Sequence, residues 1–171
     1  MNTIFLIGFM GAGKTTIGKN LSQRLSMNVV DTDDMIEKVC QKTINDIFKE
    51  EGEEAFRHHE STILKELSWP ETIVTTGGGI IKNPENRQFM HQQGIVIYLH
   101  TDPRVVLERT ADDDSRPLLA QNRKQRITRL LNERLPQYLE ADYTVNTSMK
   151  SVDTITEEIA GFLARDRRFR A

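Results

Sequence analysis

The chain has 171 residues, of which 37% are hydrophobic and 28% are charged, and its formal net charge at pH 7 is −2. This length and this balance are typical of a single globular domain, here residues 1–171. The small net charge excludes the overall basic field that holds nucleic acid, so we expect small-molecule partners and no nucleic acid.

Export and membrane insertion are not expected either. The apolar start of the chain lacks a basic leader and a cleavage site, and glycines and Lys14 interrupt it before signal-peptide length. No apolar run approaches the roughly 20 residues that span a bilayer, and the single cysteine, Cys40, excludes an intramolecular disulfide. We expect a cytoplasmic protein without membrane contact, acting as a monomer.

The first predicted strand covers residues 4–7, a continuous apolar run of the kind found in strands buried on both faces. A glycine-rich turn and then a helix follow it. In this helix Ile17, Leu21 and Leu25 recur four residues apart, which places them on one face, toward a sheet.

The next elements are a short strand and two helical pieces. Residues 29–30 predict the strand, which runs into the polar residues 31–34. Thr43 has the character of an N-cap, with Asp46 three residues later. Gly52 is expected to separate the two helical pieces. The second piece carries an apolar stripe made of Phe56, Ile63, Leu64 and Leu67.

Strands and helices continue to alternate in the rest of the chain. Residues 73–76 and 95–99 predict buried strands, and residues 77–79 are three glycines. Helix starts are expected at Asn83 before Pro84 and at Thr101 or Asp102 before Pro103. Later elements are a helix over residues 127–138 that contains Pro136, a strand over 143–145, a last helix capped by Ser151, and a solvated basic tail over 165–170.

Residues 111–124 interrupt this regular pattern. The segment is largely polar, contains Pro117 and carries three successive aspartates, Asp112 to Asp114. Such composition predicts a mobile excursion from the domain. The alternation elsewhere predicts a layered α/β fold with a mostly parallel sheet and ligands at the carboxyl ends of its strands.

The strongest motif is the sequence GFMGAGKT, Gly8 to Thr15, which matches the phosphate-loop pattern between a predicted strand and a predicted helix. Its glycines let backbone N–H groups converge on phosphate oxygens, and the helix N-terminus adds positive dipole. Lys14 is expected to reach the outer phosphates and the Thr15 hydroxyl to bind Mg²⁺. The predicted nucleotide contacts of this loop are Gly11, Ala12, Gly13, Lys14, Thr15 and Thr16.

Two carboxylates, Asp31 and Asp33, follow the second predicted strand. Their spacing places both near the phosphate loop, where one could serve the metal and the other a substrate hydroxyl. Alternatively, the aspartates only cap the following helix. The residues alone leave both interpretations open.

The ordered set of motifs resembles the shikimate kinase family over nearly the whole chain. Six landmarks occur in the family's order at compatible spacings. They are GFMGAGKTT from Gly8, DTD at Asp31 to Asp33, EEAFR ending at Arg57, TGGG at Thr76 to Gly79, RPLL at Arg116 to Leu119, and NERLPQY with Arg134 and Tyr138.

This resemblance implies a fold and a reaction. The fold would be a three-layer P-loop kinase fold of the α/β class, with a five-stranded parallel sheet flanked by helices, a substrate-binding region at about 33–60 and a mobile lid at about 111–124. The reaction would move the γ-phosphoryl group of ATP to the 3-hydroxyl of shikimate, giving shikimate 3-phosphate and ADP, with Mg²⁺ as cofactor.

The resemblance also implies which residues bind the substrate. Asp33 would hold and deprotonate the hydroxyl, Arg57 and Arg134 would grip the carboxylate, and the glycine turn at Gly78 and Gly79 would offer backbone N–H groups. The planar fork of arginine suits a carboxylate, and charged hydrogen bonds contribute roughly 1.5–3 kcal/mol each.

A second set of implied residues serves the nucleotide. Lys14 and Arg116 would act on the phosphates, with Arg116 closing over them from the lid, and Arg109 would lie against adenine. Thr15 would bind Mg²⁺, with Asp31 helping through water. Phosphoryl transfer depends on positioning and charge neutralisation, which these residues would supply. The aspartate run just before Arg116 departs from the family pattern and leaves lid geometry open.

Other interpretations compete with these. Arg57 and Arg134 lie near glutamates on their own predicted helices, so surface pairing could account for either. His58 and His59 have no accompanying metal-ligand pattern and are expected at the surface. At the level of the whole protein, the alternatives are a related kinase for another sugar acid and a catalytically inactive nucleotide-binding regulator.

Overall fold

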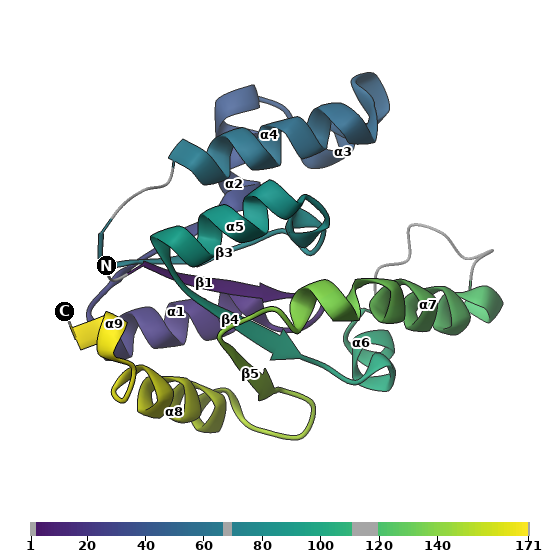
Figure 1. Ribbon diagram of the computed structural model, residues 1–171. Helices are drawn as coiled ribbons and strands as arrows, with labels where there is room; N and C mark the ends of the chain where they lie inside the picture. The colour runs from purple at the N-terminus through teal and green to yellow at the C-terminus, as the bar shows by residue number, and fades with distance from the viewer. Residues whose placement is uncertain (1–2, 67–69, 111–119, 171) are drawn as a thin grey trace.

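The computed structural model describes residues 3–66, 70–110 and 120–170. Five parallel strands form one sheet in the order β2-β3-β1-β4-β5 (Figure 1). The described part of the chain therefore has the five-stranded parallel sheet that the sequence predicts. The strands are β1 (Thr3–Gly8), β2 (Asn28–Asp31), β3 (Thr72–Thr75), β4 (Gly94–His100) and β5 (Tyr143–Asn146).

Helices cover both faces of the sheet, and a group of three helices stands beside it (Figure 1). Helices α1 and α8 lie on one face, and α5 lies on the other. The helices are α1 (Lys14–Leu25), α2 (Thr32–Cys40), α3 (Ile44–Glu50), α4 (Gly52–Glu66), α5 (Pro84–Gln93), α6 (Pro103–Arg109), α7 (Ala120–Tyr138), α8 (Val152–Leu163) and α9 (Arg167–Arg170), with a 3₁₀ turn, η1, at Ile80–Lys82.

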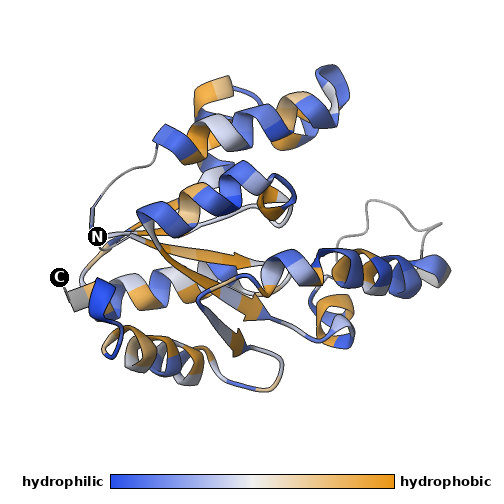
Figure 2. Ribbon diagram, in the orientation of Figure 1, coloured by the Kyte–Doolittle hydropathy of each residue, from blue (hydrophilic) through white to orange (hydrophobic). Residues whose placement is uncertain are grey.

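Two hydrophobic cores explain why the strands are continuously apolar. Along β1, Phe5 and Ile7 face the core that α4, α5 and α7 cover, whereas Ile4 and Leu6 face the core that α1 and α8 cover. Side chains alternate between the faces of a strand, so a strand with a core on each side has apolar residues at every position. Figure 2 shows this as orange strands between helices that are part orange and part blue.

Caps predicted from the sequence begin four of the helices. The side chains of Thr43, Asn83, Asp102 and Ser151 each accept a hydrogen bond from a backbone N–H in the first turn of α3, α5, α6 and α8, respectively. Gly52 separates α3 from α4 as predicted. Its φ of +88° lies in the left-handed region that glycine adopts without strain.

The segment predicted as a mobile excursion is partly helical. Helix α7 begins at Ala120, so residues 120–124 belong to a helix and the prediction is wrong for them. Residues 111–119, which include the aspartate run and Arg116, lie outside the described residues, as does Leu67. Pro136 lies within α7 without ending it, and Leu139 N donates to Leu135 O beyond it at 2.9 Å.

The basic tail is more ordered than predicted. A short helix, α9, follows α8, so α8 is not the last helix. Arg168 pairs with Asp142 at 2.9 Å and with Asp166 at 2.7 Å, and Phe169 packs on the α1–α8 core. Asp142 also accepts a hydrogen bond from Val96 N, at 2.8 Å. The tail is therefore docked against the edge of β4.

The parallel sheet brings several polar strand ends to one side of the molecule. The phosphate-loop motif follows β1, Asp31 ends β2, and the glycine turn at 77–79 follows β3. Because β2, β3 and β1 are neighbours in the sheet, these three segments are adjacent. No helix in the described ranges is long and apolar enough to cross a membrane.

Candidate active site

The phosphate-loop motif forms a tight turn between β1 and α1. Gly11 and Gly13 have φ values of +73° and +88°, which disfavour any side chain there. The turn places the predicted nucleotide contacts around the N-terminus of α1, where backbone N–H groups lack helical partners. Those residues are Gly11, Ala12, Gly13, Lys14, Thr15 and Thr16.

Lys14 folds back over its own loop. Its Nζ donates to Gly8 O at 2.8 Å and to Phe9 O at 3.0 Å. Burial lowers the pKa of Lys14 to about 8, and the nearby Asp33 and Asp31 carboxylates oppose that shift. The loop therefore already surrounds a cationic group, where phosphate oxygens could replace the two carbonyls.

Asp31 both caps a helix and faces the phosphate loop. Its Oδ1 accepts from Asp33 N at 2.9 Å, the N-cap of α2, and its Oδ2 accepts from Thr75 Oγ1 at 2.6 Å and Thr15 Oγ1 at 3.3 Å. The two interpretations of the aspartate motif are thus compatible for this residue. Thr15 and Asp31 offer two adjacent oxygen atoms, the ligand type that Mg²⁺ prefers, while several ligands would remain for phosphates and water.

Asp33 differs from Asp31 in lacking partners. Among the described residues, its buried Oδ1 has no hydrogen-bond partner. Burial, reinforced by Asp31, raises the pKa of Asp33 to about 6, whereas Lys14 and Arg57 favour its charged form. A Cβ on Gly77 would lie 2.8 Å from this oxygen and 2.6 Å from Glu60 Oε1, so the glycine lets two buried carboxylate oxygens approach the turn closely. Asp33 is placed to accept a hydrogen bond from a ligand hydroxyl.

Arg57 reaches the glycine turn from α4. Its Nη1 donates to Glu60 Oε2 at 2.5 Å, and its Nη2 lies 3.3 Å from Glu53 Oε1. The guanidinium lies against Gly79, where a Cβ would come 2.4 Å from Nη1. Pairing within the helix therefore occurs, as the alternative interpretation proposed. Glu60, however, is only 1% exposed, so its pair with Arg57 is not a surface pair.

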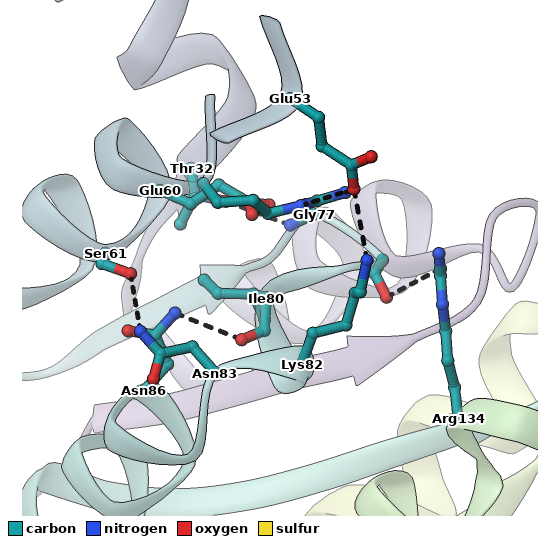
Figure 3. A network of polar contacts seen from close by, with 12 residues as sticks. Thr32, Glu53, Glu60, Ser61, Gly77, Ile80, Lys82, Asn83, Asn86 and Arg134 are labelled. Atoms are coloured by element: carbon teal, nitrogen blue, oxygen red, sulfur yellow. Dashed lines mark hydrogen bonds and ion pairs between the residues drawn. The ribbon is translucent and has the colours of Figure 1, made fainter. Parts of the chain in front are cut away.

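Arg134 reaches the same turn from α7 (Figure 3). Its Nη1 lies 3.4 Å from Gly78 O, and its guanidinium sits 5.5 Å from the centre of the Phe9 ring. Tyr138, one helical turn later, donates from its hydroxyl to Gly78 O at 2.6 Å. The structure thus brings Asp33, Arg57 and Arg134 to one glycine turn beside the phosphate loop.

Arg109 joins two loops at the far side of the phosphate turn. Its Nη1 donates to Gly11 O at 3.0 Å and its Nη2 to Thr147 O at 3.2 Å. These contacts place Arg109 next to the phosphate loop. Arg116, the remaining predicted site residue, lies outside the described residues.

Sequence reasoning missed Glu60 and Tyr138 as parts of the site. Glu60 was treated as a surface partner, although it lies four residues after Phe56 on the buried stripe of α4. Burial raises the pKa of Glu60, and its Oε1 lacks a partner among the described residues. Tyr138 is named in the NERLPQY motif without a role. Its position four residues after Arg134 puts both on one helix face, a usable signal.

The described residues contain no cluster of three or more histidine, cysteine or acidic side chains that could hold a metal ion unaided. His59 lies 3.3 Å from Glu51 and His58 is exposed, which agrees with the surface location predicted for both. A metal at this site would therefore need ligands from the nucleotide as well as from Thr15 and Asp31.

Comparison with known proteins adds independent information. The model of the family described as shikimate kinase matches residues 10–164. The shikimate kinase of Bacillus mycoides (strain KBAB4) is 47% identical over 159 residues, which cover 93% of this chain and 96% of the relative. That of Caldicellulosiruptor bescii is 40% identical, covering 93% and 94%.

Solved structures agree with the sequence relatives. The shikimate kinase from Acinetobacter baumannii, in complex with shikimate, is 39% identical with a TM-score of 0.90, and the match covers 98% of this chain and 95% of that one. A gluconokinase from Sinorhizobium meliloti, 16% identical with a TM-score of 0.59 over 96% and 92%, shares the fold alone. On the family model and these near full-length matches, the chain belongs to the shikimate kinase family.

Proposed function

We propose that this chain transfers the γ-phosphoryl group of ATP to the 3-hydroxyl of shikimate, forming shikimate 3-phosphate and ADP. The observation that carries the proposal is the buried Asp33 carboxylate, which interacts with Lys14 of the phosphate loop and whose Oδ1 has no hydrogen-bond partner among the described residues. A hydroxyl donor and a phosphoryl group would meet at this point. Membership of the shikimate kinase family supports the choice of acceptor.

Asp33 is the group proposed to act on the hydroxyl. With a pKa raised to about 6, it is mostly ionised at neutral pH and still basic enough to accept a proton as the new P–O bond forms. Its location near Lys14 keeps the base close to the phosphates. The role predicted from the sequence is therefore kept as the proposal.

Arg57 and Arg134 are proposed to bind the substrate carboxylate. The support is their position, because one guanidinium lies against Gly79 and the other lies 3.4 Å from Gly78 O. Two cations at one short glycine turn would select an acid over a neutral alcohol. The backbone N–H groups of Gly78 and Gly79 would orient the ring hydroxyls.

The nucleotide would lie over the loop from Gly11 to Thr16. Lys14 would exchange its two carbonyl partners for phosphate oxygens, while Thr15 and Asp31 would hold Mg²⁺. The metal would neutralise phosphate charge. Arg109 is proposed to contact adenine and Arg116 the phosphates. We place the enzyme in the cytoplasm, where ATP is supplied, and propose a monomer because the acidic, arginine and phosphate-loop groups all come from one chain.

The deciding experiment follows ADP release with and without shikimate, and with and without Mg²⁺. We expect release to require both, and the product to be shikimate 3-phosphate by mass spectrometry. Gluconate serves as the comparison acceptor, because it also carries a carboxylate and hydroxyls. Turnover that ignores shikimate, or that prefers gluconate, would refute the proposed acceptor.

A further inference from the structure

The carbonyl group of Gly78 is held from outside its own loop. The neighbouring carbonyls are used by the following turn, since Gly77 O accepts from Ile80 N at 3.2 Å and Gly79 O accepts from Lys82 N at 3.0 Å. Gly78 O instead accepts the hydroxyl of Tyr138 at 2.6 Å and lies 3.4 Å from Arg134 Nη1. Helix α7 therefore holds the Gly78 carbonyl, which does not take part in the hydrogen bonds of the following turn.

The contact between Tyr138 and the Gly78 carbonyl also sets the direction of the Gly79 N–H. The carbonyl of Gly78 and the N–H of Gly79 belong to the same planar peptide unit and point in opposite directions. Holding the oxygen on α7 therefore aims the N–H away from α7. Gly79 lies against the Arg57 guanidinium, which is proposed to bind the substrate, so an N–H directed away from α7 would be available to the same ligand.

Tyr138 is well placed to act as a rigid donor. It is fully buried, and its ring stacks on Tyr98 with centroids 4.7 Å apart and planes 3° from parallel. Burial raises the pKa of Tyr138 to about 12, although the neighbouring Arg134 guanidinium, which also contacts the hydroxyl, opposes this shift. The hydroxyl therefore stays protonated at neutral pH. Tyr98 is anchored in turn, because its hydroxyl lies 3.0 Å from His100 Nδ1.

We propose that Tyr138 is a positioning residue that orients the Gly78–Gly79 peptide, so that the Gly79 N–H faces the substrate. The inference rests on the proposed function, because it assigns this N–H to substrate binding. Two glycines flank the peptide and allow it to rotate. Without the hydroxyl, the peptide could turn its carbonyl oxygen toward an oxygen-rich substrate. A hydrogen bond to the carbonyl also polarises the peptide and strengthens the N–H as a donor.

The test compares two substitutions that each remove one hydroxyl from the stacked pair. Tyr138→Phe should raise the KM for shikimate about three- to tenfold, the equivalent of one neutral hydrogen bond, with the KM for ATP unchanged. Tyr98→Phe keeps the ring stack and loses only the contact to His100, so its KM for shikimate should stay at the wild-type value. Thermal unfolding of both variants controls for folding.

Amide NMR reports the orientation of the peptide, and the separate KM values for shikimate and ATP report whether that orientation serves substrate binding. Tyr138→Phe should shift the Gly79 amide resonance in the absence of substrate, and Tyr98→Phe should leave it in place. In the wild-type protein, adding shikimate should change the chemical shift of the Gly79 amide, while the chemical shift of the Gly78 carbonyl carbon should not change. This titration remains available if Tyr138→Phe does not fold.

Three outcomes would overturn the inference. They are a Tyr138→Phe enzyme with wild-type KM for shikimate and an unmoved Gly79 amide, equal losses for ATP and shikimate, or a Gly78 carbonyl that moves as far as the Gly79 amide on titration. Failure of the proposed function looks different, because the wild-type enzyme would then not respond to shikimate. The Gly79 amide of the substrate-free variant would still test the peptide orientation.

Discussion

The two sides of the glycine turn hold their arginines in different ways. On the α4 side, Arg57 is paired with Glu60, a carboxylate that is almost completely buried, and with the exposed Glu53. On the α7 side, Arg134 lies near a backbone carbonyl and over an aromatic ring. The ion pairs of Arg57 thus include one buried carboxylate, whereas Arg134 contacts a backbone carbonyl of the turn and an aromatic ring.

Removing Arg57 should have the largest effect, because Arg57 is paired with a buried carboxylate. Arg57→Ala leaves Glu60 buried without its cation, and we expect a loss of about 3 kcal/mol in the free energy of unfolding, together with loss of shikimate turnover. Urea denaturation measures the first effect and ADP release the second. The matched control is Arg57→Ala with Glu60→Gln, which should recover most of the stability. Equal destabilisation of both would contradict the buried-pair argument.

Removing Arg134 should mainly affect binding. For Arg134→Ala we expect the KM for shikimate to rise about 10- to 100-fold, the equivalent of a charge-assisted hydrogen bond, with little change in the KM for ATP. The free energy of unfolding should fall by less than for Arg57→Ala, because Arg57 forms the ion pair with the buried Glu60. An unchanged dependence on shikimate would remove Arg134 from the site.

The pH dependence tests Asp33, which lies near both the phosphate loop and Arg57. Because its pKa is raised to about 6 from the ordinary 3.8, the folded state favours the protonated form. Its contribution to stability is thus greatest at low pH and is lost as pH rises through about 6. Turnover should run the opposite way, falling about tenfold per pH unit below 6 because the base form disappears.

Steady-state rates between pH 5 and 8 measure this profile, with circular dichroism at each pH to confirm folding. Asp33→Asn should lose the step near pH 6 as well as most of the activity. A rate profile that stays flat through pH 6 in the wild-type enzyme would argue against Asp33 as the proton acceptor.

The smallest effect is expected from a substitution of Glu53, the exposed one of the two glutamates that pair with Arg57. The carboxylate is more than half exposed and shared between Arg57 and Lys82. Glu53→Gln should therefore change the free energy of unfolding by less than about 1 kcal/mol. Parallel urea denaturation curves for Glu53→Gln and Arg57→Ala would show whether the burial of Glu60 accounts for the difference in the loss of stability. A large loss in the Glu53 variant would contradict it.

The fold was predictable because its signals are local. Continuous apolar runs predicted strands with a core on each face, and the caps at Thr43, Asn83 and Ser151 were confirmed. The family relationship was likewise predictable from ordered motifs and is confirmed. The start of α7 at Ala120 was missed because a polar helix turn carries no apolar period.

The site was predictable only in part. Asp31, Asp33, Arg57 and Arg134 were named from motifs, and the structure brings them to adjacent strand ends, while their roles stay predictions. The position of Glu60, four residues after Phe56 on the apolar stripe, indicates its burial, but its pairing with Arg57 at the glycine turn depends on how α4 packs there. The contact from Tyr138 to Gly78 joins residues 60 positions apart, a separation that no local pattern reports.

Lys14 donates hydrogen bonds from its ammonium group to the carbonyls of Gly8 and Phe9. These hydrogen bonds affect the entropy of nucleotide binding. The loop is closed around the Lys14 ammonium, so phosphate oxygens would replace the two carbonyl oxygens as its hydrogen-bond acceptors. Little chain has to be ordered at that moment, and the entropic penalty of capture is correspondingly small. Replacing this lysine would therefore remove the proposed contact to phosphate and also the two hydrogen bonds that hold the loop closed.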